Sequence, residues 1–321
     1  MDCKALELNE AMTVRKFESH YIIVFENSVK KLTFQSKVMQ QEFERIVAQG
    51  SIESDSISEG LLKVLCDYRI VVPMVDLKYK NTTFDRTAKF IRSAYGQLPD
   101  ESVWSKRILI LGAGGVGQIV LQHLAAAGFK EFTIIDCDTV CPTNLNRQLL
   151  LSYREVGQRK VTAVKDRVQS LLPVNIVAHD IEIKSVSDLD GIVAATPVNL
   201  IVCAADYPIN MINRIVATVA LKRSVPCCFA SVGLQIASVG PMLVSEDSKQ
   251  RYLSWKRDEN DGQTIYQSRL AASISFTNTM TSVLLGFEIF KFLTGLGSCE
   301  ILDRELFVCG ESGKNIYCRK V

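Results

Sequence analysis

A short apolar run that leads directly into a glycine-rich turn constrains this chain more than any other feature. Residues 107–117 read RILILGAGGVG, and a second apolar run ends in Asp136. The glycines that match the spacing G-x-G-x-x-G are Gly112, Gly114 and Gly117, and Gly115 is a further small residue between them. In such a strand–turn–helix unit, backbone N–H groups approach phosphates, and an acid about twenty residues later binds ribose hydroxyls. The pattern predicts a nucleotide site and, taken alone, favours a dehydrogenase.

Strand and helix patterns alternate from residue 108 onward. Strands are expected at 108–111, 132–136, 175–183, 200–206 and 226–233, and helices at 117–129, 160–172 and 210–223. A long helix over 277–293 and two short strands, 305–310 and 315–320, follow. Because short apolar strands alternate with amphipathic helices, we expect an α/β fold built on a Rossmann-like, doubly wound and mainly parallel sheet.

The N-terminal part of the chain has a different pattern. Two β-rich runs, 21–25 and 29–34, precede a helical run that Ser36 can cap and Gly50 can end, and a second helix begins near Leu61. This order predicts a small winged-helix-like α+β domain over residues 1–80, followed by a second domain over 81–321. The domain is either a packing appendage or a peptide-binding module whose exposed ribbon edge accepts an extra strand.

Composition excludes several classes of function. The 37 basic and 35 acidic residues nearly balance, which does not favour a nucleic-acid-binding surface. The N-terminus lacks the apolar segment of a secretory signal, and the longest uncharged run, 270–287, is too rich in Ser, Thr and Asn to span a bilayer. We therefore expect a cytoplasmic protein. None of the ten cysteines forms a C-x-x-C pair, so no structural zinc is predicted. Whether Cys299, Cys309 and Cys318 bind a metal stays open.

Polar residues after Asp136 point away from a dehydrogenase. Asn144 and Arg147 lie in a polar loop, Lys160 stands where a helix should begin, and Asp206 follows an apolar strand. The carboxyl ends of strands border the ligand crevice of an open α/β sheet, so these side chains can converge on one ligand. Two cations and a carboxylate suited to Mg²⁺ fit a triphosphate that is being cleaved.

Residues 84 to about 296 resemble the ThiF/MoeB superfamily, the adenylating enzymes related to ubiquitin-activating enzymes. The resemblance rests on GAGGVG, DCDTVCPTNLNRQ, VGQRK and CAAD in the family's order and spacing. It implies that Asp136 contacts the ATP ribose, with Asp138 of the same motif also at the ATP site. It implies that Asn144, Arg147 and Lys160 handle the phosphates and that Asp206 organises Mg²⁺. The FDR at 84–86 resembles the family's arginine-bearing motif, which implies a homodimer in which Arg86 acts in the partner's site.

Two departures from the family narrow the expected function. The zinc-binding C-x-x-C pairs are missing, and the stretch 229–298 offers no cysteine to accept an acyl group. The N-terminal domain resembles the leader-recognition element of the microcin C and pantocin A maturation enzymes. We therefore expect ATP-dependent adenylation of a carboxylate on a ribosomally made precursor peptide in antibiotic biosynthesis, with pantocin-type Glu–Glu crosslinking favoured. Residues 245–270 are expected to form a crossover loop that contacts the peptide or is simply solvated.

Other functions remain as alternatives. A microcin-type enzyme would activate a peptide terminus instead, and a family member of another branch would activate a ubiquitin-like sulfur carrier or a tRNA base. The non-enzymatic alternative is a degenerate scaffold subunit that pairs with an active partner. Intact Arg147, Lys160 and Asp206 speak against this last possibility.

Overall fold

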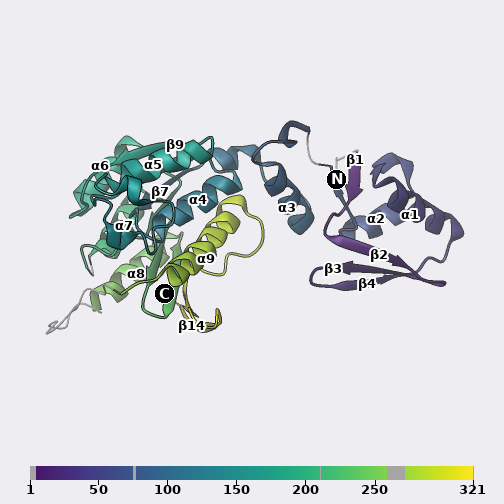
Figure 1. Ribbon diagram of the computed structural model, residues 1–321. Helices are drawn as coiled ribbons and strands as arrows, with labels where there is room; N and C mark the ends of the chain where they lie inside the picture. The colour runs from purple at the N-terminus through teal and green to yellow at the C-terminus, as the bar shows by residue number, and fades with distance from the viewer. Residues whose placement is uncertain (1–4, 75–76, 210, 259–271, 321) are drawn as a thin grey trace. The chain divides into compact units, whose positions relative to one another are not determined.

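The computed structural model describes residues 5–74, 77–209, 211–258 and 272–320. The chain folds into two compact units, Met1–Pro99 and Asp100–Val321 (Figure 1). No helix within these described ranges is both long and apolar enough to cross a membrane.

The larger unit is built on an eight-stranded sheet in the order β14-β13-β12-β11-β10-β7-β8-β9. The strands are β7 (Arg107–Leu111), β8 (Glu131–Ile135), β9 (Asn175–His179), β10 (Leu200–Cys203), β11 (Cys227–Val232), β12 (Ile236–Leu243), β13 (Arg304–Cys309) and β14 (Asn315–Lys320). The five strands from β11 to β9 are parallel, and β12, β13 and β14 add to them in antiparallel fashion. This arrangement confirms the α/β, doubly wound sheet that the alternating pattern predicts.

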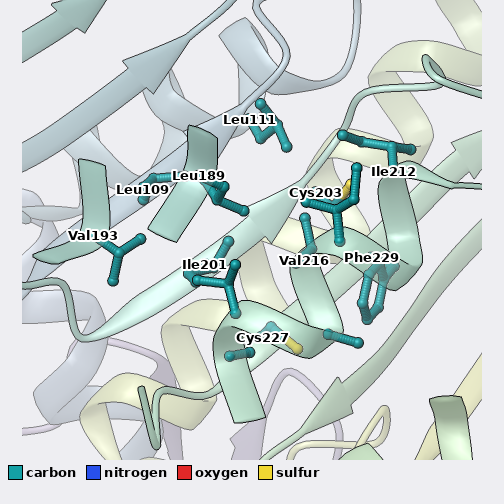
Figure 2. Packing of buried hydrophobic residues seen from close by; sticks show 14 of the residues in the cluster. Leu109, Leu111, Leu189, Val193, Ile201, Cys203, Ile212, Val216, Cys227 and Phe229 are labelled. Carbon is teal, nitrogen blue, oxygen red and sulfur yellow. The ribbon is translucent and has the colours of Figure 1, made fainter. Parts of the chain in front are cut away.

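Helices cover both faces of this sheet. They are α4 (Gly117–Ala127), α5 (Lys160–Leu171), α6 (Val186–Ala195), α7 (Ile212–Lys222), α8 (Glu246–Asp258) and α9 (Ser275–Thr294). Leu109, Ile201 and Cys227 belong to one core cluster with residues of α6, α7 and α8 (Figure 2). Side chains alternate along a strand, so Ile110 and Cys228 lie on the other face of the sheet. Both faces are buried, which explains why residues 108–111 of β7 and all of β10 read as apolar runs.

Two elements of the larger unit differ from the expectation. Helix α6 was not foreseen, although Ser185 and Asp188 form a capping box that starts it. The region expected to be a crossover loop, 245–270, begins with helix α8, so that prediction is wrong for residues 246–258. The helix forms because its apolar side joins the core: Tyr252 is 2% exposed and stacks on Phe229. Residues 259–270 lie outside the described part of the chain.

The smaller unit contains two three-stranded sheets, β5-β1-β6 and β2-β3-β4. Their strands are β1 (Ala5–Leu8), β2 (Met12–Lys16), β3 (Tyr21–Phe25), β4 (Val29–Leu32), β5 (Ser51–Glu53) and β6 (Val71–Pro73), and the helices are α1 (Lys37–Gln49), α2 (Glu59–Asp67) and α3 (Asp85–Tyr95). Ser36 caps α1 by accepting a hydrogen bond from the Val38 N–H, and Gly50 ends it in the left-handed conformation, as the sequence predicts. Phe43 and Ile46 of α1 pack with Ile23 of β3 in one core.

Helix α3 belongs to this smaller unit, whereas the sequence placed the domain boundary near residue 80. Arg92 of α3 is 1% exposed and pairs with Glu7 of β1. The Asn9 side chain also donates to the Ser93 carbonyl at 3.3 Å. These polar contacts tie α3 to β1 and to the residue that follows β1, across a long stretch of sequence, and sequence periodicity carries no information about them.

Candidate functional site

The order in which the chain adds strands to the sheet reverses between β7 and β10. From β7 the chain adds β8 and β9 on one side, and then crosses to add β10 and β11 on the other. Ligands of open α/β sheets bind beyond the carboxyl ends of the strands at such a switch point. Gly112 follows β7, Asp136 follows β8, and Ala204 to Asp206 follow β10. The topology therefore brings the sequence-predicted site residues of three strands to one edge of the sheet.

The four glycines after β7 serve different purposes. Gly112 has a φ of 100°, and a Cβ there would lie 2.7 Å from the Ala204 carbonyl oxygen. A Cβ on Gly115 or Gly117 would come closer than 3.0 Å to Asn278 or to the Gly112 backbone. Around Gly114, in contrast, no described atom beyond Gly114 and its two chain neighbours lies within 4 Å of the Cβ position. Three glycines are thus required by the packing of the protein itself, and Gly114 leaves open space where a phosphate can approach.

Asp136 holds the start of the glycine loop. Its carboxylate accepts hydrogen bonds from the Ala113 N–H at 2.7 Å and from the Asp138 N–H at 2.8 Å. Two carboxylate oxygens offer about four acceptor positions, so capacity remains for ribose hydroxyls. The half-buried Asp136 can therefore bind the ribose while it orients the loop that faces the phosphates.

Lys160 supplies a largely buried cation at the same edge. It is the first residue of α5 and is 6% exposed. Its Nζ donates to an Asp138 carboxylate oxygen at 2.7 Å, and its N–H donates to the Asp138 carbonyl at 2.9 Å. Asp138 is exposed. Lys160 and Asp138 thus form a charged pair whose ammonium can turn to an incoming phosphate.

Asn144 and Arg147 lie in the loop after β8, which contains a short 3₁₀ helix, η4 (Pro142–Asn144). The Asn144 side-chain oxygen accepts a hydrogen bond from the Cys141 N–H at 3.0 Å, so it also shapes the loop. The Arg147 guanidinium donates to the Thr143 carbonyl at 3.1 Å. The Cγ of Arg147 lies 3.3 Å from the Cβ position of Gly115. The structure therefore brings Arg147 beside the glycine loop.

Two further residues were selected from the sequence. Asp206 is exposed in the segment after β10, where the Ala204 N–H donates to the Leu111 carbonyl at 2.8 Å. Arg86 is exposed on α3 of the smaller unit, so its role in a nucleotide site stays a prediction. On the same helix, Arg92 is buried against Glu7 and serves the fold.

Sequence reasoning missed the contribution of α9. Asn278 is 5% exposed, and its amide donates to the Ser273 hydroxyl at 2.8 Å and to the Ile274 carbonyl at 2.7 Å, directly beside Gly115. The Ser282 hydroxyl donates to the Val116 carbonyl at 3.2 Å. The available signal was the run of Ser, Thr and Asn in an otherwise apolar helix, which marks its buried, loop-contacting side.

Cysteines occur both at this edge and in the sheet: Cys137 is half-buried and Cys141 is exposed in the loop after β8. Cys227 and Cys228 are fully buried in β11, and burial raises the pKa of both thiols, which keeps them protonated. Within the described ranges, no three or more His, Cys, Asp and Glu side chains gather where they could hold a metal ion. The charged groups at the switch point are cations and carboxylates, and burial raises the pKa of the neighbouring Cys137 thiol.

Known proteins resemble this chain in part of its sequence. The SUMO-activating enzyme subunit 2 of Dictyostelium discoideum is 35% identical over 133 residues, 37% of this chain and 20% of that protein. The molybdopterin-synthase adenylyltransferase of Escherichia coli is 39% identical over 89 residues, 26% of this chain and 36% of that protein. The chain thus spans well under two thirds of the length of these relatives.

Solved structures match nearly the whole length of this chain. The E. coli enzyme MccB with ATP has a TM-score of 0.75 at 20% identity, covering 98% of this chain and 96% of its own. The microcin C7 biosynthetic enzyme MccB in complex with N-formylated MccA gives 0.74 at 18% identity over 98% and 96%. PaaA gives 0.68 at 17% identity over 97% and 99%. The model of the ThiF family matches residues 88–312, and this chain belongs to the ThiF family.

Proposed function

We propose that this protein uses ATP to adenylate a carboxylate of a peptide. The observation that carries adenylation is the grouping at the switch point: the open face of Gly114, Arg147 beside the glycine loop and the buried Lys160 cation, with Asp136 in place for a ribose. These groups suit phosphate binding and charge neutralisation. They include neither a general base nor a thiol nucleophile. This chain resembles an adenylyltransferase and an activating enzyme, and the names of both agree with this reaction.

The proposed reaction needs little more than positioning. A carboxylate oxygen of the peptide attacks the α-phosphorus of ATP, the bond from that phosphorus to the bridging oxygen breaks, and pyrophosphate leaves. A Glu side chain has a reference pKa of about 4.3, so it is ionised at neutral pH and requires no base. Arg147, Lys160 and Asn144 stabilise the charge that develops on the phosphates. A second nucleophile of the peptide then attacks the acyl carbon, and AMP leaves.

A magnesium ion fits the residues that are present. Mg²⁺ is usually held by one or two carboxylates together with substrate phosphates and water, so it does not need a cluster of protein ligands. The exposed carboxylate of Asp206, which follows β10 at the switch point, is the candidate ligand. When bound, the ion supplies charge neutralisation for the departing pyrophosphate.

The smaller unit supports a peptide as the substrate. The likeness to MccB extends over 98% of this chain, and MccB is described in complex with MccA. In the smaller unit, β2 and β4 each pair with β3 and with no other described strand, which leaves two edges of the β2–β3–β4 sheet for an extra strand. We place the leader peptide on β4, where all residues but Leu32 are exposed.

Proline substitutions can test this placement. The hydrogen bond from the Phe25 N–H to the Ser28 carbonyl fixes the alternation along β4, so that Lys31 directs its N–H outward. Lys31→Pro should weaken leader binding, measured by fluorescence anisotropy, because proline removes the outward donor. On β2, the hydrogen bond from the Phe17 N–H to the His20 carbonyl sets the same alternation. The N–H of Val14 therefore points away from β3, which makes Val14→Pro the matched variant. Loss with Val14→Pro alone would place the leader on β2, and unchanged binding in both variants would refute strand addition.

Within peptide modification, we favour Glu–Glu crosslinking of the pantocin type. The missing C-x-x-C pairs and the buried cysteines of β11 speak against transfer to a thiol, so capture of the adenylate by the same peptide is the simpler outcome. Mass spectrometry of the peptide distinguishes the alternatives. Crosslinking by amide or carbon–carbon acylation removes one water from the peptide, whereas microcin-type activation of a terminus leaves a terminal adenylate or its nitrogen-linked product.

A homodimer is part of the proposal. Leu149, Phe276, Val283 and Phe287 form an exposed apolar face on α9 and the adjoining loop, and a shallow groove lies along it. Residues 274–287 carry no charge, which suits a self-complementary contact with a second copy. If Arg86 acts in the partner's site, mixing the inactive variants Arg86→Ala and Asp206→Ala should restore part of the activity. Failure to restore it would contradict the action of Arg86 in the partner's site.

Peptide-dependent exchange of pyrophosphate into ATP tests the reaction itself. Wild-type protein with its precursor peptide should show exchange, and Asp206→Ala should reduce it by about 100-fold, the scale of losing one group that stabilises the transition state. Asp166→Ala, an exposed aspartate of α5 outside the switch point, is the matched control. Exchange with a ubiquitin-like protein instead of a peptide would favour sulfur-carrier activation. Failure to bind ATP·Mg²⁺ would favour the scaffold alternative.

A further inference from the structure

Gln118 is a fully buried amide that joins the two loops of the nucleotide site. It is the second residue of α4 and is 0% exposed. Its Nε2 donates to the Gly114 carbonyl at 3.2 Å, and its Oε1 accepts from the Leu150 N–H at 3.2 Å. A carbonyl can only accept and an N–H can only donate, so these two partners fix the orientation of the amide.

The hydrogen bond from Gln118 to the Gly114 carbonyl determines the direction of the Gly115 N–H. The Gly114 carbonyl also accepts from the Gln118 N–H at 3.3 Å, so this oxygen is turned toward α4. A trans peptide is planar and places the next N–H opposite to the carbonyl. The Gly115 N–H must therefore point away from α4. Gln118 thereby fixes a backbone donor at the place where the site needs one for a phosphate.

The bond to Leu150 acts on the second loop. Leu150 is 8% exposed, so its N–H requires a partner inside the protein. Leu150 lies three residues after Arg147. The Leu151 N–H donates to the Gln148 carbonyl at 3.1 Å, so the backbone between Arg147 and Leu151 forms a turn. Gln118 therefore anchors the end of the segment that carries Asn144 and Arg147.

We propose that Gln118 is a positioning residue for the nucleotide: it holds the Gly115 N–H and the Arg147 loop in register, so that both engage the phosphates of one ATP. This inference rests on the proposed function for its choice of ligand. It assigns the side chain no contact with ATP and no chemical step.

Gln118→Met, which has similar size but neither bond, tests the proposal. The Kd for ATP·Mg²⁺, measured by calorimetry without peptide and well below the unfolding temperature, should rise by about 10- to 100-fold, because two buried partners lose their hydrogen bonds. Gln122→Met, one turn further along α4, is the matched control and should bind ATP like the wild type. An unchanged Kd for Gln118→Met would overturn the proposal.

Gln118→Glu provides a signature that a purely structural role would not give. A neutral carboxyl can donate through its hydroxyl and accept through its carbonyl, as the glutamine does, whereas an ionised carboxylate cannot donate to Gly114. Burial raises the pKa of such a group. The affinity for ATP, expressed relative to wild type at each pH, should therefore recover as the pH falls. A ratio that does not change with pH would contradict the role assigned to the Gly114 bond.

These measurements separate the inference from the proposed function. If wild-type protein binds ATP but shows no peptide-dependent exchange, the peptide proposal fails while the Kd values still decide the role of Gln118. If exchange is present and Gln118→Met leaves both the Kd and the exchange rate unchanged, the role of Gln118 fails alone.

Discussion

Adjacent alanine substitutions at Gly114 and Gly115 should have opposite effects. At Gly114 no described atom beyond the residue itself and its two chain neighbours lies within 4 Å of the new methyl group, and the residue does not have a positive φ. Such a Gly→Ala change stabilises by about 0.4–1 kcal/mol, because it restricts the unfolded chain. The same methyl group projects into the space through which a phosphate must approach the loop. We therefore expect Gly114→Ala to fold at least as well as wild type and to lose ATP affinity by about 10- to 100-fold, or about 1.4–2.7 kcal/mol.

At Gly115 the methyl group meets the protein instead. Its Cβ would lie closer than 3.0 Å to the Asn278 amide, which would have to move. Asn278 would then lose its bonds to Ser273 and Ile274, each worth about 1 kcal/mol, and crowding adds about 1–3 kcal/mol. We expect a loss of about 3–5 kcal/mol. For a unit as long as Asp100–Val321, this lowers Tm by about 6–20 °C.

Differential scanning fluorimetry and calorimetric titration with ATP·Mg²⁺ measure the two effects separately. A double-mutant cycle with Asn278→Ser isolates the contact, since Gly115→Ala should cost little further stability once the amide has been removed. If Gly114→Ala binds ATP like wild type, the phosphate does not approach the loop at Gly114. If Gly114→Ala is as unstable as Gly115→Ala, the space that we assign to the ligand is filled by protein.

Three further predictions concern charge and capping. Lys160→Met should reduce peptide-dependent exchange by at least about 100-fold while Tm changes little, because the pair with Asp138 is replaced by an apolar side chain at a buried position; wild-type exchange in this variant would exclude Lys160 from the site. The Arg223 and Lys222 side chains lower the pKa of Asp190 to about 2, so its contribution to stability should be complete above about pH 4 and lost as the pH falls toward 2. The Tm difference between wild type and Asp190→Asn should accordingly close on acidification, and a constant difference would contradict this. Ser36→Ala should destabilise the smaller unit by about 1 kcal/mol in denaturant unfolding and Ser36→Gly by less, because the Val38 N–H loses its cap.

The local elements of this fold were largely readable from the sequence. Ser36 and Gly50 mark the ends of α1 because capping depends on a few neighbouring residues. The apolar run before Gly112 predicts a strand that is buried on both faces, and β7 is such a strand. Helix α8 was missed because its sequence, Glu246–Asp258, is mostly polar, and the burial of Tyr252 against Phe229 depends on a strand elsewhere in the chain.

The same distinction between sequence and tertiary structure applies to the site. The sequence by itself selected the glycines, Asp136, Lys160 and Arg147, because the chemistry of phosphate binding requires particular residue types at particular spacings. Only the tertiary structure separated Gly114, which faces open space, from Gly115, which faces Asn278. Only the tertiary structure joined Gln118 to Gly114 and Leu150. The physical reason is that packing and buried hydrogen bonds depend on which segments the fold brings together, and a residue's own sequence neighbours do not encode that pairing.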